Sequence, residues 1–391
     1  MHRAFFLDWL RIGAFGLLVL YHVGMLYVGW DWHIKSPHAG PALEPLMRLS
    51  NPWRMGLLFV LSGAATAFML QARPQGLLRE RSRRLLLPLL LGVVLVVPPQ
   101  AYFEVVQRLG YAGSYVDFLQ RYFTGYGGFC RGTHCLVLPT WNHLWFLPYL
   151  WCYTVLLVLL RAALPAAWRA ALAARFGALA PWQLWLLPVL GLALIRLTLL
   201  SRFGSTHALV DDWFNHASYG LLFLLGVGLG AQPQHFARLQ ALRWPALVLA
   251  LLCWANIEAY LGHVVRTGAV PEGLRELQRV AYAALQWSAI LAALGFAHRH
   301  LNADHPWRAR LSEAVFPVYL VHQTVIIVAA MVLAPSALPV AVEAPLLVLL
   351  AFAGSAVFWW LARSAGPLRP WLGLPRQSYL PAGTLPSTPL T

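Results

Sequence analysis

Long apolar runs separated by short polar segments dominate this chain. Each run is about 18–25 residues long, which is the length that an α-helix needs to cross the hydrocarbon core of a bilayer. The first run carries Arg11 and His22 and has no small-residue cleavage pattern, so we expect a retained span and not a signal peptide. The pattern predicts ten spans: Leu10–Val28, Arg54–Gln71, Leu85–Tyr102, Leu144–Leu160, Trp182–Leu200, Trp213–Gly230, Trp244–Leu261, Val280–Ala297, Ser312–Leu333 and Ala344–Leu361.

The composition supports the same interpretation. Of the 391 residues, 59% are hydrophobic and 11% are charged, whereas a soluble domain carries roughly 25% charged residues. So few charges cannot cover a globule in water, but they suffice for a protein in a lipid bilayer. We therefore expect an all-α integral membrane protein. The net charge of +15 lies in short loops and accompanies no nucleic-acid-binding motif, so we expect no nucleic-acid partner.

Basic residues are unequally distributed between alternate loops. Seventeen Lys and Arg lie at the termini and in the loops on one side of the predicted spans, and eight lie on the other side. Because basic residues accumulate on the cytoplasmic side of a membrane, we expect both termini to be cytoplasmic. The loop from about Phe103 to Asn142 is then extracytoplasmic, and its Cys130 and Cys135 are either a disulfide or two free thiols.

Ionisable side chains inside a span are costly and are therefore candidates for function. Arg11 and His22 are eleven residues apart in the first span, which places them within ~20° of each other around the helix and ~16 Å apart along its axis. A neutral His can take a proton from a hydroxyl nucleophile, and an Arg can bind a phosphate-bearing donor. The alternative is that Arg11 reaches the headgroups and His22 is a hydrogen-bonded residue of the bundle.

A cluster of arginines follows the second span, in the sequence Arg79-Glu-Arg-Ser-Arg83-Arg84. Arg81 and Arg84 are three residues apart and can share a helical face. Such a cluster is typical of ordinary anchoring at the cytoplasmic surface. It also suits a clamp for a phosphate-rich molecule such as coenzyme A.

Polar residues also recur on the predicted outer side. Asp212 and His216 open the sixth span and are neighbours on a helix, although Asp212 could equally be an N-cap. In the ninth span, Tyr319 and His322 lie at a depth comparable to that of His22. No HExxH, P-loop or GxSxG pattern is present, so the sequence favours neither a hydrolase nor a metal site.

In their order along the chain, these residues resemble the motifs of the acyltransferase-3 family of bacterial membrane proteins, including its glucans biosynthesis protein C branch. The resemblance covers about Phe5 to Arg363. The matching segments are Phe6–Arg11 followed by His22, Trp32-His33-Ile34-Lys35, Leu58–Gly63, the cluster ending at Arg84, Asn142–Leu147, Asp212-Trp213 with Gly226 and Gly228, and Pro317–Gln323.

The resemblance implies a ten-helix enzyme of the bacterial inner membrane. Such an enzyme takes an acyl group from cytoplasmic acyl-coenzyme A, here acetyl- or succinyl-coenzyme A, and delivers it to a hydroxyl, usually of a carbohydrate, on the outer side. The family's Arg-x10-His motif falls on Arg11 and His22, and its Arg-x-x-Arg motif falls on Arg81 and Arg84. We therefore expect the donor's phosphates to bind near these three arginines.

His22 is then the expected general base, with Asp212, His216 or His322 as its orienting partner. Residues 1–368 would form the transmembrane acyltransferase domain, without the exterior esterase-like domain of many relatives. Residues 369–391 would form a short cytoplasmic tail, in which we expect Gln377–Thr391 to be disordered. The alternative function is a transporter or flippase without covalent chemistry, in which intramembrane Arg, His and Glu258 would line a permeation path.

Overall fold

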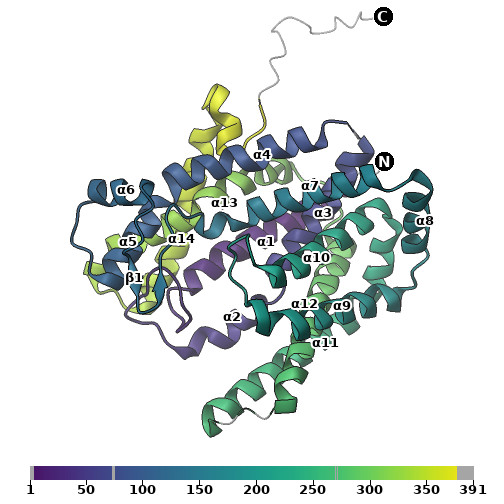
Figure 1. Ribbon diagram of the computed structural model, residues 1–391, viewed down its shortest axis with the longest axis horizontal. Coiled ribbons are helices and arrows are strands. Elements are labelled where there is room, and N and C mark those ends of the chain that lie inside the picture. Colours follow the sequence, from purple (N-terminus) through teal and green to yellow (C-terminus); the bar gives the residue numbers. More distant parts are fainter. Residues whose placement is uncertain (1–3, 73–74, 269, 271, 377–391) are drawn as a thin grey trace, which may run out of the picture.

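The computed structural model describes residues 4–72, 75–268, 270 and 272–376, and these fold into a bundle of long helices (Figure 1). Nine helices in the described ranges are long and apolar enough to cross a membrane, and a bent pair makes a tenth span. The protein is therefore an all-α, multi-pass membrane protein, as the apolar runs predict. The spanning helices are α1 (Phe5–Gly24), α3 (Arg54–Ala72), α4 (Leu77–Leu91) with α5 (Pro98–Leu109), α7 (Phe146–Ala163), α9 (Pro181–Phe203), α10 (Trp213–Ala231), α11 (Gln234–Thr267), α12 (Glu272–His300), α13 (Pro306–Leu333) and α14 (Val340–Arg363).

The third span, which we predict over Leu85–Tyr102, is a bent pair of helices. Helices α4 and α5 are joined through the π-helical turn η2 (Gly92–Val96), and the chain bends by 41° at the break. Pro98 and Pro99 open α5, and a proline ring lacks the N–H that a continuous helix would need. After the bend, Gln100 on α5 lies 3.4 Å from Nδ1 of His143, a residue of the site described below.

Helices α11 and α12 are much longer than their apolar runs. Their paired ends extend beyond the rest of the bundle as a hairpin, which Figure 1 shows at the bottom of the view. The apolar pattern predicted only Trp244–Leu261 and Val280–Ala297, because it registers the part of a helix that lies in lipid. The more polar extensions at their ends continue the same helices.

Helices α3 and α10 pack with their backbones in contact. A Cβ atom on Gly63 would lie 2.0 Å from the carbonyl oxygen of Phe223, and one on Gly226 would lie 2.1 Å from that of Val60. Close approach through small residues is the usual way in which helices associate in a membrane. Gly226 therefore has a packing role, which brings α10 against the helix that carries Arg54.

The predicted outer loop has structure of its own. It contains helix α6 (Tyr115–Phe123) and the antiparallel hairpin of β1 (Cys130–Arg131) and β2 (His134–Cys135). A disulfide joins Cys130 to Cys135, which decides between the two states that the sequence left open. The buried rings of Phe118 and Tyr122 attach the loop to the bundle.

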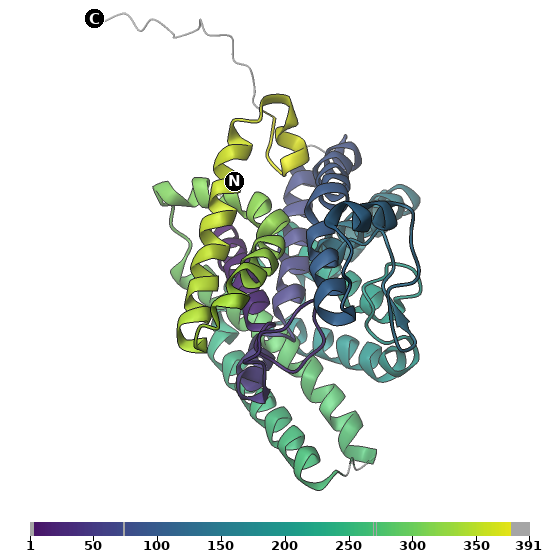
Figure 2. The same cartoon turned by 90° about the vertical axis from the view of Figure 1, so that its left-hand side faces the viewer.

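The remaining elements are short. They are η1 (Pro41–Leu43), α2 (Glu44–Ser50), η3 (Asn142–Trp145), α8 (Ala166–Gly177), η4 (Ala334–Ser336) and η5 (Gly366–Leu372). Figure 2 shows that α14 ends, and η5 follows, at the same end of the bundle at which α1 begins. An even number of spans requires this arrangement. That this end faces the cytoplasm stays a prediction from the distribution of charge.

Element η5 spans residue 369, at which we predicted the tail to begin, and that division of the chain stays a prediction. Element η5 packs against α4 and α14, and the buried Arg369 has three hydrogen-bond partners. Its guanidinium donates to the carbonyl oxygens of Arg363 (2.7 Å) and Pro375 (3.0 Å) and to the carboxylate of Glu313 (3.2 Å). Residues 369–376 are thus held by charge-assisted hydrogen bonds that no local pattern reveals. The predicted disorder of Gln377–Thr391 lies outside the described residues.

Candidate active site

Two histidines from opposite ends of the chain meet inside the bundle. Nδ1 of His22, on α1, lies 2.8 Å from Nε2 of His322, on α13, and the two rings are nearly parallel. Nδ1 of His322 lies 2.8 Å from the carbonyl oxygen of Tyr319. Because a carbonyl only accepts, this Nδ1 carries the hydrogen, and Nε2 of His322 accepts the hydrogen on Nδ1 of His22. The network therefore leaves Nε2 of His22 with a free lone pair.

A second layer of polar groups supports this pair. His143, in η3, donates from Nε2 to the carbonyl oxygen of Leu320 (3.1 Å), and its own carbonyl accepts from the hydroxyl of Tyr319 (2.8 Å). The side chain of Gln100 lies 3.4 Å from Nδ1 of His143 and donates to the hydroxyl of Thr324 (2.7 Å). Buried polar groups that are mutually satisfied hold one another in place. The orientation of His22 is thus set by a network that reaches α5 and η3.

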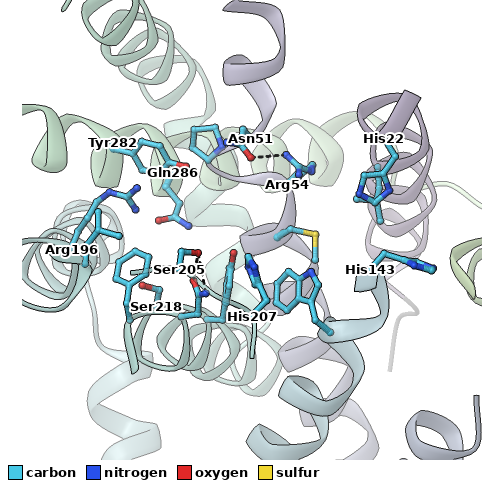
Figure 3. A pocket seen from close by; sticks show the side chains of 18 of the residues that line it. His22, Asn51, Arg54, His143, Arg196, Ser205, His207, Ser218, Tyr282 and Gln286 are labelled. Carbon is cyan, nitrogen blue, oxygen red and sulfur yellow. Dashed lines mark hydrogen bonds between the residues drawn. The ribbon is translucent and has the colours of Figure 1, made fainter. Parts of the chain in front are cut away.

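His22 lines a cavity of about 370 Å³. In Figure 3, His22 and His143 lie at one end of it and Arg196 and Tyr282 at the other, with Arg54 and Asn51 between them. Most of its polar atoms belong to amides, hydroxyls, imidazoles and guanidinium groups. The polar lining residues are His22, Asn51, Arg54, His143, Arg196, Ser205, His207, Asn215, Ser218, Tyr219, Tyr282, Gln286 and Tyr319.

Two arginines of this cavity were not singled out from the sequence. Arg54, on α3, is 8% exposed, its guanidinium lies over the ring of Tyr21 (3.1 Å), and it donates to Asn51 (3.0 Å). Arg196, on α9, lies over the ring of Tyr282 (3.5 Å). Both lie in the predicted spans, so the rule that intramembrane charges mark function was a signal for them.

Asp212 does not contact His22, although it was a candidate for its partner. Its carboxylate accepts hydrogen bonds from the hydroxyl of Tyr149, from the amide of Asn215 (2.8 Å) and from the backbone N–H of His207 (3.0 Å). Burial alone would raise the pKa of Asp212, but the hydrogen bonds from Tyr149 and Asn215 hold it below its usual value. Asp212 is therefore a charged anchor for the loop between α9 and α10.

That loop places another histidine in the cavity. His207 has a positive φ of 57° and its ring lies 4.0 Å from the ring of Trp145. Burial lowers the pKa of His207 to about 4, so the ring is neutral at pH 7. No motif of the sequence indicated His207, because its place depends on a loop conformation that Asp212 fixes from a distance of several residues.

His216 lies outside this cavity as well. Its Nε2 is 2.6 Å from the carbonyl oxygen of Leu209, and its ring stacks on that of Tyr149. It lines a separate, mostly apolar cavity with Leu209 and Trp213. Of the three partners considered for His22, the structure brings only His322 to it.

The three arginines expected to bind the donor have different surroundings. Arg11 is 3.4 Å from Asp8, which also binds Arg308 (2.6 Å), and it lies within electrostatic range of Arg84. Arg81 is buried and donates to the carbonyl oxygen of Ser62 (3.1 Å) and to the hydroxyl of Thr66. Arg81 therefore attaches α4 to α3. Although Arg81 and Arg84 are three residues apart on one helix, their side chains have different surroundings.

Arg84 lines a second cavity, of about 470 Å³, at the end of the bundle that carries η5. The first turns of α4 form one wall and residues 370–376 form the other. Its charged lining residues are Arg79, Glu80, Arg83, Arg84 and Arg376. Neither Arg11 nor Arg81 lines it, and His22 belongs to the other cavity. Within the described part of the chain, no three His, Cys, Asp or Glu side chains are grouped as the ligands of a metal ion would be.

The comparison with known protein families places this bundle in a class. Residues 5–363 match the model of a family described as an acyltransferase domain. Because the match covers nearly all of the described chain, the protein belongs to this family of membrane acyltransferases. A search of curated proteins and a search of solved structures returned no match.

Proposed function

We propose that the protein transfers an acyl group from cytoplasmic acyl-coenzyme A to a hydroxyl of an extracytoplasmic carbohydrate. The observation that carries this proposal is His22, whose Nε2 keeps a free lone pair and whose ring lines a polar cavity. In this reaction Nε2 takes the proton of the acceptor hydroxyl while the oxygen forms a bond to the thioester carbonyl carbon. The carbon–sulfur bond then breaks, and the thiolate leaves and takes up the proton.

The second cavity is the proposed donor site. Four arginines and one glutamate give it an excess of positive charge, which suits the phosphates of coenzyme A. Arg11 lies on the same helix as His22, ~16 Å below it along the axis, and it is within electrostatic range of Arg84. The two cavities are separate, so the proposal requires that donor binding opens a passage for the thioester between them. Arg81 supports this site by fixing α4 to α3.

The orientation and location are part of the proposal. We place the end with η5 in the cytoplasm and the loop with the Cys130–Cys135 disulfide outside, because basic residues favour the first and disulfides persist in oxidising compartments. The bacterial inner membrane, an acetyl or succinyl group and a glucan acceptor follow from the resemblance to the glucans biosynthesis protein C branch. They remain predictions.

A transporter is the alternative, and its residues fit less well. Glu258, a predicted part of that permeation path, accepts from Nε and Nη2 of Arg48 (2.6 and 2.8 Å) and does not line the cavity of His22. Such a pair ties α11 to α2. Membership of an acyltransferase family also favours covalent chemistry.

His22→Ala tests the proposal. The purified protein would be reconstituted in liposomes, and release of free thiol from acetyl- or succinyl-coenzyme A would be measured with and without an oligosaccharide acceptor. Loss of a general base lowers turnover by about 10²–10⁴-fold. His263→Ala is the control, because His263 lies exposed on α11. Wild-type turnover in His22→Ala would remove His22 from the chemistry.

A further inference from the structure

The cavity of His22 has a strong imbalance of charge. Arg54 and Arg196 both line it, and none of the residues that line it is an Asp or a Glu. In the part of the chain that the structure describes, the ion pairs use other arginines. These are Arg11, Arg48, Arg108, Arg308, Arg363 and Arg369.

Arg54 is more than nine-tenths buried, and its hydrogen-bonding capacity is only partly used. A guanidinium has five N–H donors. One nitrogen of Arg54 donates to Asn51, and its Nε has no partner among the described residues. The ring of Tyr21 compensates for part of the charge. Burial of a charge is nevertheless unfavourable unless an opposite charge pairs with it. The described residues around Arg54 do not supply that opposite charge.

Arg196, at the opposite end of the cavity, is also held over a tyrosine ring. Its guanidinium lies over Tyr282, as that of Arg54 lies over Tyr21. Tyr219 and Tyr282 are within electrostatic range of both cations. Two guanidinium groups held on aromatic rings, in a cavity without carboxylates, form a fixed positive environment that an anion would neutralise.

We infer that this cavity contains a subsite for an anionic substrate group, a carboxylate or a phosphate, bound by Arg54 and Arg196. The inference rests on the proposed function and specifies the substrate of the same site. The amides of Asn51 and Gln286 and the hydroxyl of Ser218 line the same space and supply neutral donors around the anion. The volume of about 370 Å³ lies within the range of sites for small molecules.

The subsite would also act on the base. Arg54 is within electrostatic range of His22, and a nearby cation opposes the positive charge that the ring gains when it takes a proton. A bound anion removes this opposition. The charge of the substrate would then favour both its binding and its reaction. The anion can belong to the acyl group, as the free carboxylate of a dicarboxylic half-thioester, or to the acceptor, as an acidic sugar.

The test compares charged with neutral substrates in Arg54→Gln and Arg196→Gln. Succinyl- and butyryl-coenzyme A differ in the charge of the acyl group, and glucuronate- and glucose-containing oligosaccharides differ in the charge of the acceptor. We expect kcat/KM for the anionic substrate to fall at least about tenfold in either variant, the loss of one charge-assisted contact, and that for its neutral counterpart to change less than about threefold. Dependence on donor charge assigns the anion to the acyl group, and dependence on acceptor charge assigns it to the acceptor.

Two controls complete the design. Arg202→Gln alters an exposed arginine at the end of the same helix as Arg196 and should leave kcat/KM unchanged. Arg54→Lys keeps the charge but loses the planar fork, so it should retain more activity than Arg54→Gln and shows whether position 54 tolerates substitution. Equal losses with charged and neutral substrates, or no loss in either glutamine variant, would overturn the inference.

A binding measurement separates this inference from the proposed chemistry. Calorimetric titration of the His22→Ala variant with succinate and with inorganic phosphate should show binding of at least one of these anions. Addition of Arg54→Gln to this variant should weaken the affinity for that anion about tenfold. Binding that Arg54→Gln leaves unchanged, or no binding of either anion, refutes the subsite even if His22→Ala has lost turnover. Normal turnover in His22→Ala refutes the proposed chemistry and leaves the result on the anion standing.

Discussion

Replacement of His322 by leucine removes the acceptor that holds His22 in one tautomer. In the wild-type protein Nδ1 of His22 donates to His322 over 2.8 Å, and His322 is itself fixed by the carbonyl oxygen of Tyr319. Leucine has a similar bulk but no acceptor. His22 would then be free to place its hydrogen on Nε2, the nitrogen that has to be unprotonated for the reaction.

The size of the effect follows from how the hydrogen bond changes during the reaction. A hydrogen bond between neutral groups contributes roughly 0.5–1.5 kcal/mol, and one to a charged group contributes roughly 1.5–3 kcal/mol. The bond between His22 and His322 becomes charge-assisted when His22 takes a proton. The bond therefore stabilises the transition state by about 1–1.5 kcal/mol more than the ground state. His322→Leu should lower kcat about five- to thirteenfold, with little change in KM.

The assay is the acceptor-dependent release of free thiol, measured over a range of acyl-coenzyme A concentrations. His322→Gln is the matched variant, because its side-chain carbonyl can still accept from His22, and we expect it to recover most of the lost kcat. A loss as large as that of His22→Ala would make His322 the base itself. An unchanged kcat in His322→Leu would show that the pairing of the two rings has no part in the reaction.

Three further predictions concern parts of the protein away from His22. Arg376 lines the proposed donor cavity, and Arg376→Ala should raise KM for acyl-coenzyme A about two- to fivefold, the effect of one solvent-screened phosphate contact. Arg310 is exposed and lies outside that cavity, so Arg310→Ala should leave this KM unchanged. Gly226→Val should lower the free energy of unfolding in denaturant by about 1–3 kcal/mol through overpacking. Gly262→Val should change this free energy little, because the space around Gly262 is open. Equal effects of the two substitutions would exclude the close packing of α3 and α10. Burial lowers the pKa of Lys35 to about 8, below the value of about 10.4 in an unfolded chain. Between these values the unfolded state binds more protons, so stability rises with pH, and Lys35→Met should abolish that rise in melting temperature.

Much of the architecture follows from the sequence alone. Each span is a local property, because some twenty apolar residues in succession have one stable arrangement in lipid. The helices α9 and α10 accordingly begin and end within three residues of the predicted limits. The order of short motifs from Phe6 to Gln323 also indicated the family, which the match over residues 5–363 confirms. The positions of Arg11 and His22 on one helix could be placed by helical geometry, because both lie on a single rigid element.

Only the tertiary structure decided which residues act together. His22 and His322 are 300 positions apart, and depth in the membrane did not distinguish His322 from Asp212 or His216 as the partner. Arg54 and Arg196 come from α3 and α9, and their common cavity depends on how α10 packs between other helices. Periodicity gives the face and depth of a side chain on its own helix. The rotation and neighbours of that helix depend on contacts with distant segments, such as the glycine contact of α3 with α10 and the loop that Asp212 anchors, which exist only after the chain has folded.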